Sequence, residues 1–378
     1  MGKYGNVYIA KTMQGLEGVL AKELKELGAC RIKPGRRMVE FSGDMNIVYK
    51  ANYWLRTALR ILVPVRSFRA INEHQLYTET KTINWEKYLS LQHTFAVDSV
   101  VFSKYFNHSH YVALKVKDAI VDQFREKKGR RPSVDSKNPD IKINIYINID
   151  RCTISLDSSG ESLHKRGYRV DQYKAPLNEV LAAGLIMLSG WDKKTNFLDP
   201  MCGSGTFLIE AAMISRNIPP GYYRQKYSFM NWLDYDPELY RDIQVSPYSK
   251  QYEPKILGKD ISFRAIAAAR ENIQKAGLMS SISPEVSSFE TTSSPWSSGF
   301  IIMNPPYGER IKIAATGKLY KTIGDHLKKE FPGYKAWIFS SNFEALKQIG
   351  LRPTVKKILF NGPLECKFMG FEMYKGSK

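Results

Sequence analysis

The chain has 378 residues, 43% of them hydrophobic, which is enough for two or three domains and excludes a disordered or collagen-like protein. Lysine and arginine exceed aspartate and glutamate by 19, so we expect a polyanionic partner. The four cysteines form no C-x-x-C pair and no apolar run is long enough to cross a bilayer. We therefore expect a cytoplasmic protein with neither a metal site nor a membrane contact.

The first segment of the chain, residues 1–65, alternates between short strands and amphipathic helices. The pattern predicts strands at residues 7–10 and 38–41 and a helix at residues 45–55. Between the two strands, a helix with one leucine-rich face ends at Gly28. This order predicts a small α+β domain of the split βαβ type.

The second segment, residues 66–165, contains a helix at 112–128 and a strand at 141–149 in which isoleucine alternates with polar residues. Five basic residues lie close together around the end of that helix: Arg125, Lys127, Lys128, Arg130 and Arg131. They either bind phosphates or form a solvated helix end whose cations favour the helix dipole. The net charge, +12 in residues 1–170 against +7 in the rest, favours phosphate binding.

The third segment, residues 166–378, alternates between strands and helices. This pattern predicts a doubly wound parallel sheet of the Rossmann-like type. We expect an antiparallel strand pair at its end, because Asn361 and Gly362 form a turn signal between two apolar runs. Residues 217–254 are rich in tyrosine, proline and tryptophan and interrupt the alternation. We expect them to form an insertion beside the active face.

A glycine-containing loop follows the first predicted strand of this third segment, with the sequence Asp199-Pro200-Met201-Cys202-Gly203-Ser204-Gly205-Thr206. The two glycines let the backbone turn tightly and approach a ligand at the start of a helix. A dinucleotide fingerprint would need a small residue where this chain has Leu208, which disfavours NAD. The loop resembles the D-x-x-x-G-x-G signature of class I S-adenosylmethionine-dependent methyltransferases, although an ordinary tight turn would have a similar sequence.

The next predicted strand ends at Asp260, which is followed by Ile261 and a helix. Ligands of open α/β sheets bind at the carboxyl ends of the strands, and a carboxylate can accept hydrogen bonds from both hydroxyls of a ribose. Asp260 could instead be the helix N-cap, a role that Ser262 can also take. We favour ribose binding, with Ile261 beside the cofactor.

The strongest signal is Asn304-Pro305-Pro306-Tyr307, directly after the apolar run at residues 300–303. An exocyclic amine is a poor nucleophile because its lone pair is delocalised, so an enzyme must hold both of its N–H groups in acceptors. The Asn304 side-chain oxygen and the Pro305 carbonyl can be those acceptors, and Pro306 restricts the backbone that carries them. Tyr307 can stack on a base removed from its helix.

With these motifs, the chain resembles methyltransferases that join an RNA-binding THUMP domain to an N-P-P-Y catalytic domain. Further likeness lies in residues 129–135, 159–169 and 175–179. The resemblance is greatest to the N-terminal half of bacterial large-subunit rRNA guanine-N2 methyltransferases. It implies a ferredoxin-like domain, then THUMP, then a Rossmann-like domain with S-adenosylmethionine as cofactor. We also expect Lys165, Arg166 and Arg169 to bind RNA near the catalytic pocket.

The chain departs from the family at one cofactor position, where an aspartate usually precedes phenylalanine to bind the adenine amine. Here the sequence is Ser287-Ser288-Phe289-Glu290. Ser288 can accept that hydrogen bond more weakly, or Glu290 can replace it, while Phe289 can still stack on the adenine.

These observations predict methylation of a base exocyclic amine, most simply guanine N2 in 23S rRNA or a large-subunit precursor. The alternatives are adenine N6, or guanine N2 in tRNA. An enzyme that methylates a glutamine side chain shares the N-P-P-Y chemistry, and the departure at Ser288 leaves room for a non-catalytic RNA-binding assembly protein.

Overall fold

The computed structural model describes residues 6–170, 176–244, 253–306 and 313–374, which form two compact units. The first unit consists of the described residues within 1–12, 21–163 and 224–245. The second consists of those within 13–20, 164–223 and 246–378. Each unit has its own sheet and is described by itself.

The first unit is built on an eight-stranded sheet with the strand order β2-β3-β1-β4-β8-β7-β5-β6. Its strands are β1 (Asn6–Lys11), β2 (Cys30–Gly35), β3 (Met38–Gly43), β4 (Arg60–Arg69), β5 (Thr94–Phe102), β6 (Ser133–Val134), β7 (Ile141–Asn148) and β8 (Arg151–Asp157). The helices in this stretch of the chain are α1 (Glu17–Glu26), α2 (Met45–Trp54), α3 (Glu73–Lys81), η1 (Trp85–Lys87) and α4 (Ser109–Lys128). The pairing of β4 with β8 joins the two α+β parts into one sheet.

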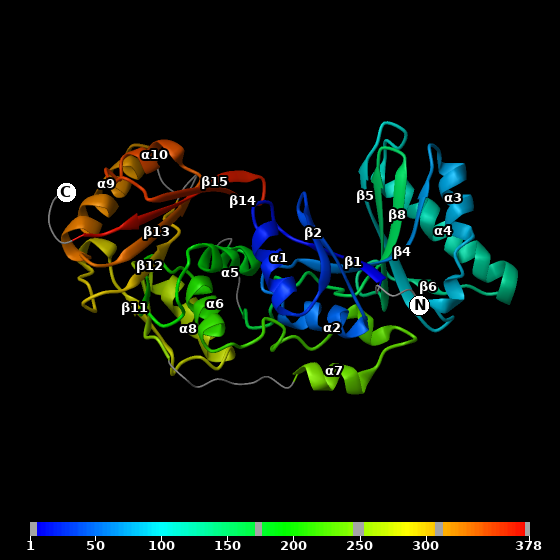
Figure 1. Ribbon diagram of the computed structural model, residues 1–378, viewed down its shortest axis with the longest axis horizontal. Helices are drawn as coiled ribbons and strands as arrows, with labels where there is room; N and C mark the ends of the chain where they lie inside the picture. Colours follow the sequence, from blue (N-terminus) through cyan, green and yellow to red (C-terminus); the bar gives the residue numbers. More distant parts are fainter. Residues whose placement is uncertain (1–5, 171–175, 245–252, 307–312, 375–378) are drawn as a thin grey trace. The chain divides into compact units, whose positions relative to one another are not determined.

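Strand β7 shows the expected alternation between a buried and an open face. Ile141, Ile143, Ile145 and Ile147 are fully buried, whereas the residues between them are partly exposed. Figure 1 shows α3 and α4 packed along one side of this part of the sheet. The period of two in the sequence therefore identified both faces of the strand.

Within the stretch 217–254, residues 224–244 pack within the first unit. The expectation that the stretch lies beside the active face stays a prediction. The Phe229 ring stacks on Tyr49 of α2 with centroids 4.5 Å apart. The Trp54 indole N–H donates to the Ile243 carbonyl at 3.4 Å. The segment forms η2 (Ser228–Asn231) and α7 (Pro237–Gln244), and its aromatic residues are buried against α2 because that packing removes large apolar surface from water.

The second unit is a seven-stranded sheet with the order β11-β10-β9-β12-β13-β15-β14. Its strands are β9 (Phe197–Asp199), β10 (Ile256–Asp260), β11 (Ile282–Val286), β12 (Phe300–Met303), β13 (Lys335–Ser340), β14 (Val355–Asn361) and β15 (Leu364–Glu372). Its helices are α5 (Glu179–Leu188), α6 (Thr206–Ser215), α8 (Phe263–Lys275), η3 (Phe289–Thr291), α9 (Ile313–Glu330) and α10 (Phe343–Lys347).

The sheet of this second unit has the predicted Rossmann-like arrangement. Strands β11, β10, β9, β12 and β13 are parallel, and β14 and β15 close the sheet as an antiparallel pair (Figure 1). Gly362 in the connecting turn has φ 62°, as its turn signal predicted. The chain leaves β9 toward β10 on one side, while β12 lies on the other, so the strand order reverses there. The carboxyl ends of β9, β10 and β12 consequently meet where α/β folds bind ligands.

Candidate active site

A cavity of about 510 Å³ lies at this carboxyl edge, within the size range of small-molecule sites. Ten residues predicted for the site line it: Asp199, Cys202, Gly203, Thr206, Asp260, Ile261, Ser288, Phe289, Asn304 and Pro306. Gly205 and Pro305 adjoin lining residues without lining the cavity themselves. Tyr307 lies outside the described residues. The structure therefore gathers motifs from separate loops around one space.

The glycine loop between β9 and α6 has the backbone that its two glycines permit. Gly203 and Gly205 both have positive φ, 53° and 83°, which residues with a side chain rarely adopt. A Cβ on Gly205 would also lie 3.3 Å from the Ala269 Cβ of α8. Gly203 has open space on its side, and it borders the cavity. The first glycine thus lets a ligand approach, while the second lets α8 approach.

Asp260 connects the glycine loop to the start of α8. One of its carboxylate oxygens accepts a hydrogen bond from the Gly203 N–H at 2.9 Å, and the other accepts from the Ser262 N–H at 2.8 Å. Ser262 is the N-cap of α8, with its hydroxyl oxygen accepting from the Ala265 N–H. Because a carboxylate offers about four acceptor positions, Asp260 keeps capacity for ligand hydroxyls.

Asp199 is the most buried acidic group of the cavity wall, with 1% of its surface exposed. Burial raises the pKa of this carboxyl well above its usual value of 3.8, and the negative charge of Asp260 raises it further. A hydrogen bond from the Met201 N–H opposes that shift. A cationic group bound in the cavity would favour the ionised form of Asp199.

Asn304 follows the last residue of β12 and borders the cavity. Its side-chain oxygen is buried, yet it accepts no hydrogen bond from any part of the chain that the structure describes. A buried acceptor without a donor costs roughly 1–3 kcal/mol, so such an atom in a cavity wall is a candidate for a ligand N–H.

Ser288 and Phe289 form the side of the cavity beyond β11. Ser288 is the N-cap of η3, and its hydroxyl accepts from the Glu290 N–H at 3.3 Å. Phe289 is 5% exposed and lies edge-on to His326, with ring centroids 4.8 Å apart. The serine hydroxyl is therefore already used in a cap, and Glu290 is the exposed acid beside it.

Arg169, expected on an RNA-facing surface, instead lies behind the glycine loop with 15% of its side chain exposed. Its guanidinium pairs with Glu179 of α5 at 2.8 Å. It also donates to the hydroxyls of Ser204 at 3.2 Å and Thr206 at 3.1 Å. This arginine therefore clamps the loop to α5, and RNA binding by Arg169 stays a prediction.

Arg166 was also expected to bind RNA, but it is 2% exposed in the core of the second unit. Its side chain pairs with Glu210 of α6 at 3.3 Å, and the Tyr168 hydroxyl donates to the same carboxylate oxygen at 3.2 Å. A charge so deeply buried needs a charged partner, so its place is structural. Lys165, which precedes Arg166 in the chain, is exposed.

The five basic residues at the end of α4 are all exposed, as RNA binding would require. Lys127 and Lys128 pair with Glu86, at 3.2 and 2.9 Å, and Arg125 pairs with Asp122 at 3.3 Å. Such surface pairs are weak and yield readily to phosphate. Arg130 and Arg131 follow the helix C-cap, Gly129, which has φ 67°.

Sequence reasoning missed the residues that support the loop from behind. Asn272 of α8 accepts from the Val170 N–H at 2.8 Å and donates to the Ser204 carbonyl at 3.1 Å. Glu210 is the single charge in an otherwise uncharged, buried helix. A lone charge in an apolar helix is a signal for a buried partner, and it could have indicated Glu210.

The cavity has the features that a nucleoside cofactor with a cationic amino acid end requires. It has a glycine turn for close approach, a carboxylate for a ribose, a buried carboxyl for a cation and, on Asn304, an acceptor that no described residue uses. Among the described residues, no cluster of potential metal ligands and no helix able to span a membrane is found. The fold and the site define a class I methyltransferase, whose cofactor is S-adenosylmethionine.

Comparisons with known proteins identify the family. The family model described as "RMKL-like, methyltransferase domain" matches residues 166–369, "THUMP domain" matches 70–157 and "RlmL ferredoxin-like domain" matches 8–62. The chain belongs to the RMKL-like methyltransferase family, with ferredoxin-like and THUMP domains before its catalytic domain.

Individual relatives agree with this assignment. The chain is 40% identical to slr0064 of Synechocystis sp., named as an RNA methyltransferase, over 97% of both proteins. It is 38% identical to ribosomal RNA large subunit methyltransferase K/L of Syntrophotalea carbinolica, but spans only 53% of that protein. The crystal structure of SMU.472 complexed with SAH superposes with a TM-score of 0.89, at 30% identity and 100% coverage of both chains.

Proposed function

We propose that this protein transfers a methyl group to the exocyclic amine of an RNA base, guanine N2 in 23S rRNA or its large-subunit precursor. The observation that carries this proposal is the buried side-chain oxygen of Asn304 in the cavity wall, which accepts no hydrogen bond from the described residues. The names of the K/L relatives, which refer to large-subunit rRNA, support the choice of substrate.

The residues around the cavity divide into those that bind the cofactor and those that orient the amine. S-adenosylmethionine supplies the electrophilic methyl group. Asp260 binds the ribose hydroxyls, Asp199 favours the cationic amino acid end, and Phe289 with Ser288 forms the adenine side. Cys202, Gly203, Thr206 and Ile261 line the space between these groups, with Gly205 shaping the turn.

Asn304 and Pro305 prepare the amine for attack. The Asn304 side-chain oxygen and the Pro305 carbonyl each accept one N–H, which turns the nitrogen lone pair toward the methyl group. Pro306 limits the conformations of that backbone, and Tyr307 is proposed to stack on the base. Once the nitrogen carries the methyl group it is cationic, so its proton leaves without a strongly tuned base.

Nucleoside mass spectrometry of rRNA and tRNA from a strain lacking the gene tests the substrate. Loss of N2-methylguanosine from 23S rRNA supports the proposal. Loss of N6-methyladenosine, or of N2-methylguanosine from tRNA only, would replace the target, and transfer to a peptide glutamine would replace the substrate class.

Asn304→Ala tests the mechanism, with Asn304→Asp as its matched control because aspartate keeps acceptor oxygens at the same place. We expect turnover of the alanine variant to fall about 100-fold, as for other positioned hydrogen-bonding groups, with cofactor affinity by calorimetry little changed. Near-normal turnover of Asn304→Ala on rRNA from the deletion strain would contradict the mechanism. Failure of the wild-type protein to bind cofactor would favour a non-catalytic assembly protein.

A further inference from the structure

Two rows of side chains cross strands β4, β8, β7 and β5 on the face opposite the buried isoleucines of the first unit. The register places them directly opposite one another from strand to strand. One row is Arg69, Arg151, Asn148 and Phe102, and the next is Ser67, Thr153, Tyr146 and Val100. The two rows, which we call the platform, contain two aromatic and two cationic residues and no acid.

The aromatic side of this platform is open to solvent. Phe102 is 63% exposed and Val100 is 43% exposed. The Phe102 ring lies edge-on to Tyr146, with centroids 6.1 Å apart, and the Lys11 ammonium lies 4.9 Å from the centre of the tyrosine ring. Aromatic rings beside cations on an open sheet are the elements with which proteins stack the bases of single strands.

The cationic side of the platform holds two like charges in direct opposition. Arg69 and Arg151 face each other across β4 and β8, an arrangement that is unfavourable unless an anion lies between them. Arg69 also forms an ion pair with Asp150 at 3.7 Å, but its side chain is 84% exposed, so this pair is weak. A phosphate bound by both guanidinium groups would remove the repulsion.

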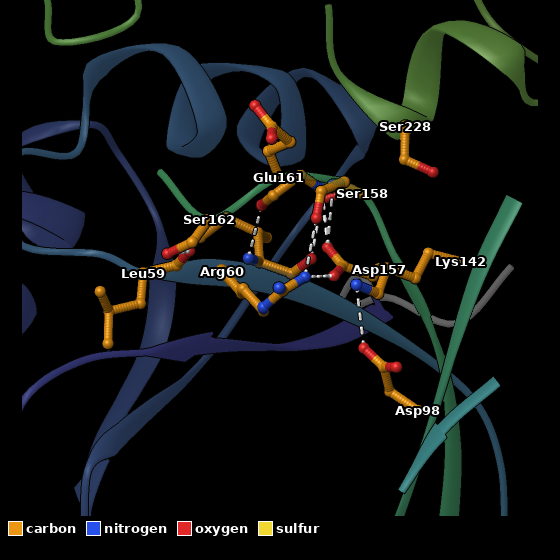
Figure 2. A network of polar contacts seen from close by, with 12 residues as sticks. Leu59, Arg60, Asp98, Lys142, Asp157, Ser158, Glu161, Ser162 and Ser228 are labelled. Carbon is orange, nitrogen blue, oxygen red and sulfur yellow. Dashed lines mark hydrogen bonds and ion pairs between the residues drawn. The ribbon is translucent and has the colours of Figure 1, made fainter. Parts of the chain in front are cut away.

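The same face is electrostatically balanced farther along the strands, which sets the platform apart. Figure 2 shows that Arg60 pairs with Asp157 there and that Lys142 pairs with Asp98, the latter at 2.9 Å. Those cations already have carboxylate partners within the sheet. Arg69 is far more exposed than Arg60 or Lys142, and its ion pair with Asp150 is longer than that of Lys142 with Asp98. The arginine pair of the platform is therefore the part of this face best suited to an external anion.

We propose that this platform docks a single-stranded segment of the substrate RNA, with bases on Phe102 and Tyr146 and a phosphate between Arg69 and Arg151. Arg151 is two strands from Phe102, about 10 Å, a distance that a nucleotide can bridge. A duplex does not fit this chemistry because its base faces are covered by neighbouring bases. The inference rests on the proposed function, since it concerns how an RNA substrate is held.

The platform is distinct from the basic residues that follow α4. Strand β5 begins opposite Ser133, close after Arg131, and ends at Phe102, so the two surfaces lie at opposite ends of a nine-residue strand. That separation is about 26 Å. Variants of the two surfaces can consequently be compared as independent contributions.

Binding by the full chain to a labelled, unstructured RNA 12-mer and to a 12-base-pair RNA duplex tests the proposal. We expect Phe102→Ala to weaken binding of the single strand at least about fivefold and to leave duplex binding unchanged, with Phe102→Trp close to wild type. Leu364→Ala, at an exposed apolar residue of the second unit, is the matched control. Unchanged single-strand affinity in Phe102→Ala, or an equal loss for the duplex, would overturn the proposal.

The arginine pair is tested separately by Arg69→Gln/Arg151→Gln. We expect the slope of log affinity against log salt for the single strand to fall by about 0.7 for each phosphate that the variant no longer binds. An unchanged slope overturns the binding of phosphate by this pair. If the wild type methylates RNA while these variants bind and react normally, the docking face is wrong and the proposed function stands. If the wild type methylates no RNA, the function is wrong, and the binding comparison still decides the docking face.

Discussion

The clamp formed by Arg169 gives the sharpest test of how the glycine loop is held. In Arg169→Met the guanidinium is lost while the apolar stem is kept, and Glu179, with 7% of its side chain exposed, loses its partner. Removing one member of a buried ion pair costs about 3–5 kcal/mol of unfolding free energy. Because Arg169 itself is 15% exposed, we expect the lower end, about 3 kcal/mol.

The same variant should also weaken cofactor binding, because Ser204 and Thr206 belong to the cavity wall. Two hydrogen bonds from the guanidinium to these hydroxyls are lost, each worth about 1.5–3 kcal/mol. The loop keeps its bonds to Asp260 and Asn272, so only part of this energy should reach the ligand. We expect a loss of about 1.4 kcal/mol, or a tenfold rise in the cofactor Kd.

Urea unfolding and calorimetric titration with S-adenosylhomocysteine measure the two effects on the same protein. Arg166→Met is the matched control, since it breaks a comparably buried pair with Glu210 farther along α6. The control should lose stability with a smaller change in Kd, and Arg169→Lys should fall between wild type and Arg169→Met because lysine lacks the planar fork. A folded Arg169→Met protein with wild-type Kd would refute the clamp.

Three further results are expected. Asp260→Ala should weaken cofactor binding by about 3 kcal/mol in calorimetry, because its charged hydrogen bonds are lost, and unchanged affinity would refute the ribose assignment. The raised pKa of Asp199 means that its contribution to stability is present at low pH and is lost as pH rises through that pKa. Asp199→Asn should therefore gain unfolding free energy over wild type as pH increases above 3.8, and a constant difference would contradict the shift. Changing Arg125, Arg130 and Arg131 to glutamine should flatten the salt dependence of RNA binding by about 0.7–0.9 for each phosphate no longer bound, whereas an unaltered slope would identify a solvated helix end.

The catalytic half of the chain could be predicted largely because its strands are short, apolar and directly followed by polar motifs. Strand β12 was predicted with its observed bounds, Phe300–Met303, and the turn at Gly362 with the strand pair around it. Strand β11 was missed, because Ile282–Val286 alternates exposed and buried residues and contains Pro284, which is tolerated at this edge of the sheet. The apolar pattern predicts a helix from Leu319 to Lys329, but helix α9 already begins at Ile313, since Gly317 lowered the helical signal without ending the helix.

What the sequence could not supply is the identity of the partners of its charged residues. The stretch containing Arg166 and Arg169 is basic, and in a protein with a net charge of +19 the simplest interpretation of such a stretch is phosphate binding. The structure places these two side chains against Glu210 and Glu179, which lie 44 and 10 residues away along the chain. A basic stretch in a sequence predicts an exposed, cationic surface only when no buried acid pairs with its cations. A carboxylate inside an apolar helix, such as Glu210 in α6, signals that such a buried acid is present. The two arginines of the docking platform, by contrast, lie 82 residues apart, and only the register of β4 against β8 brings them together.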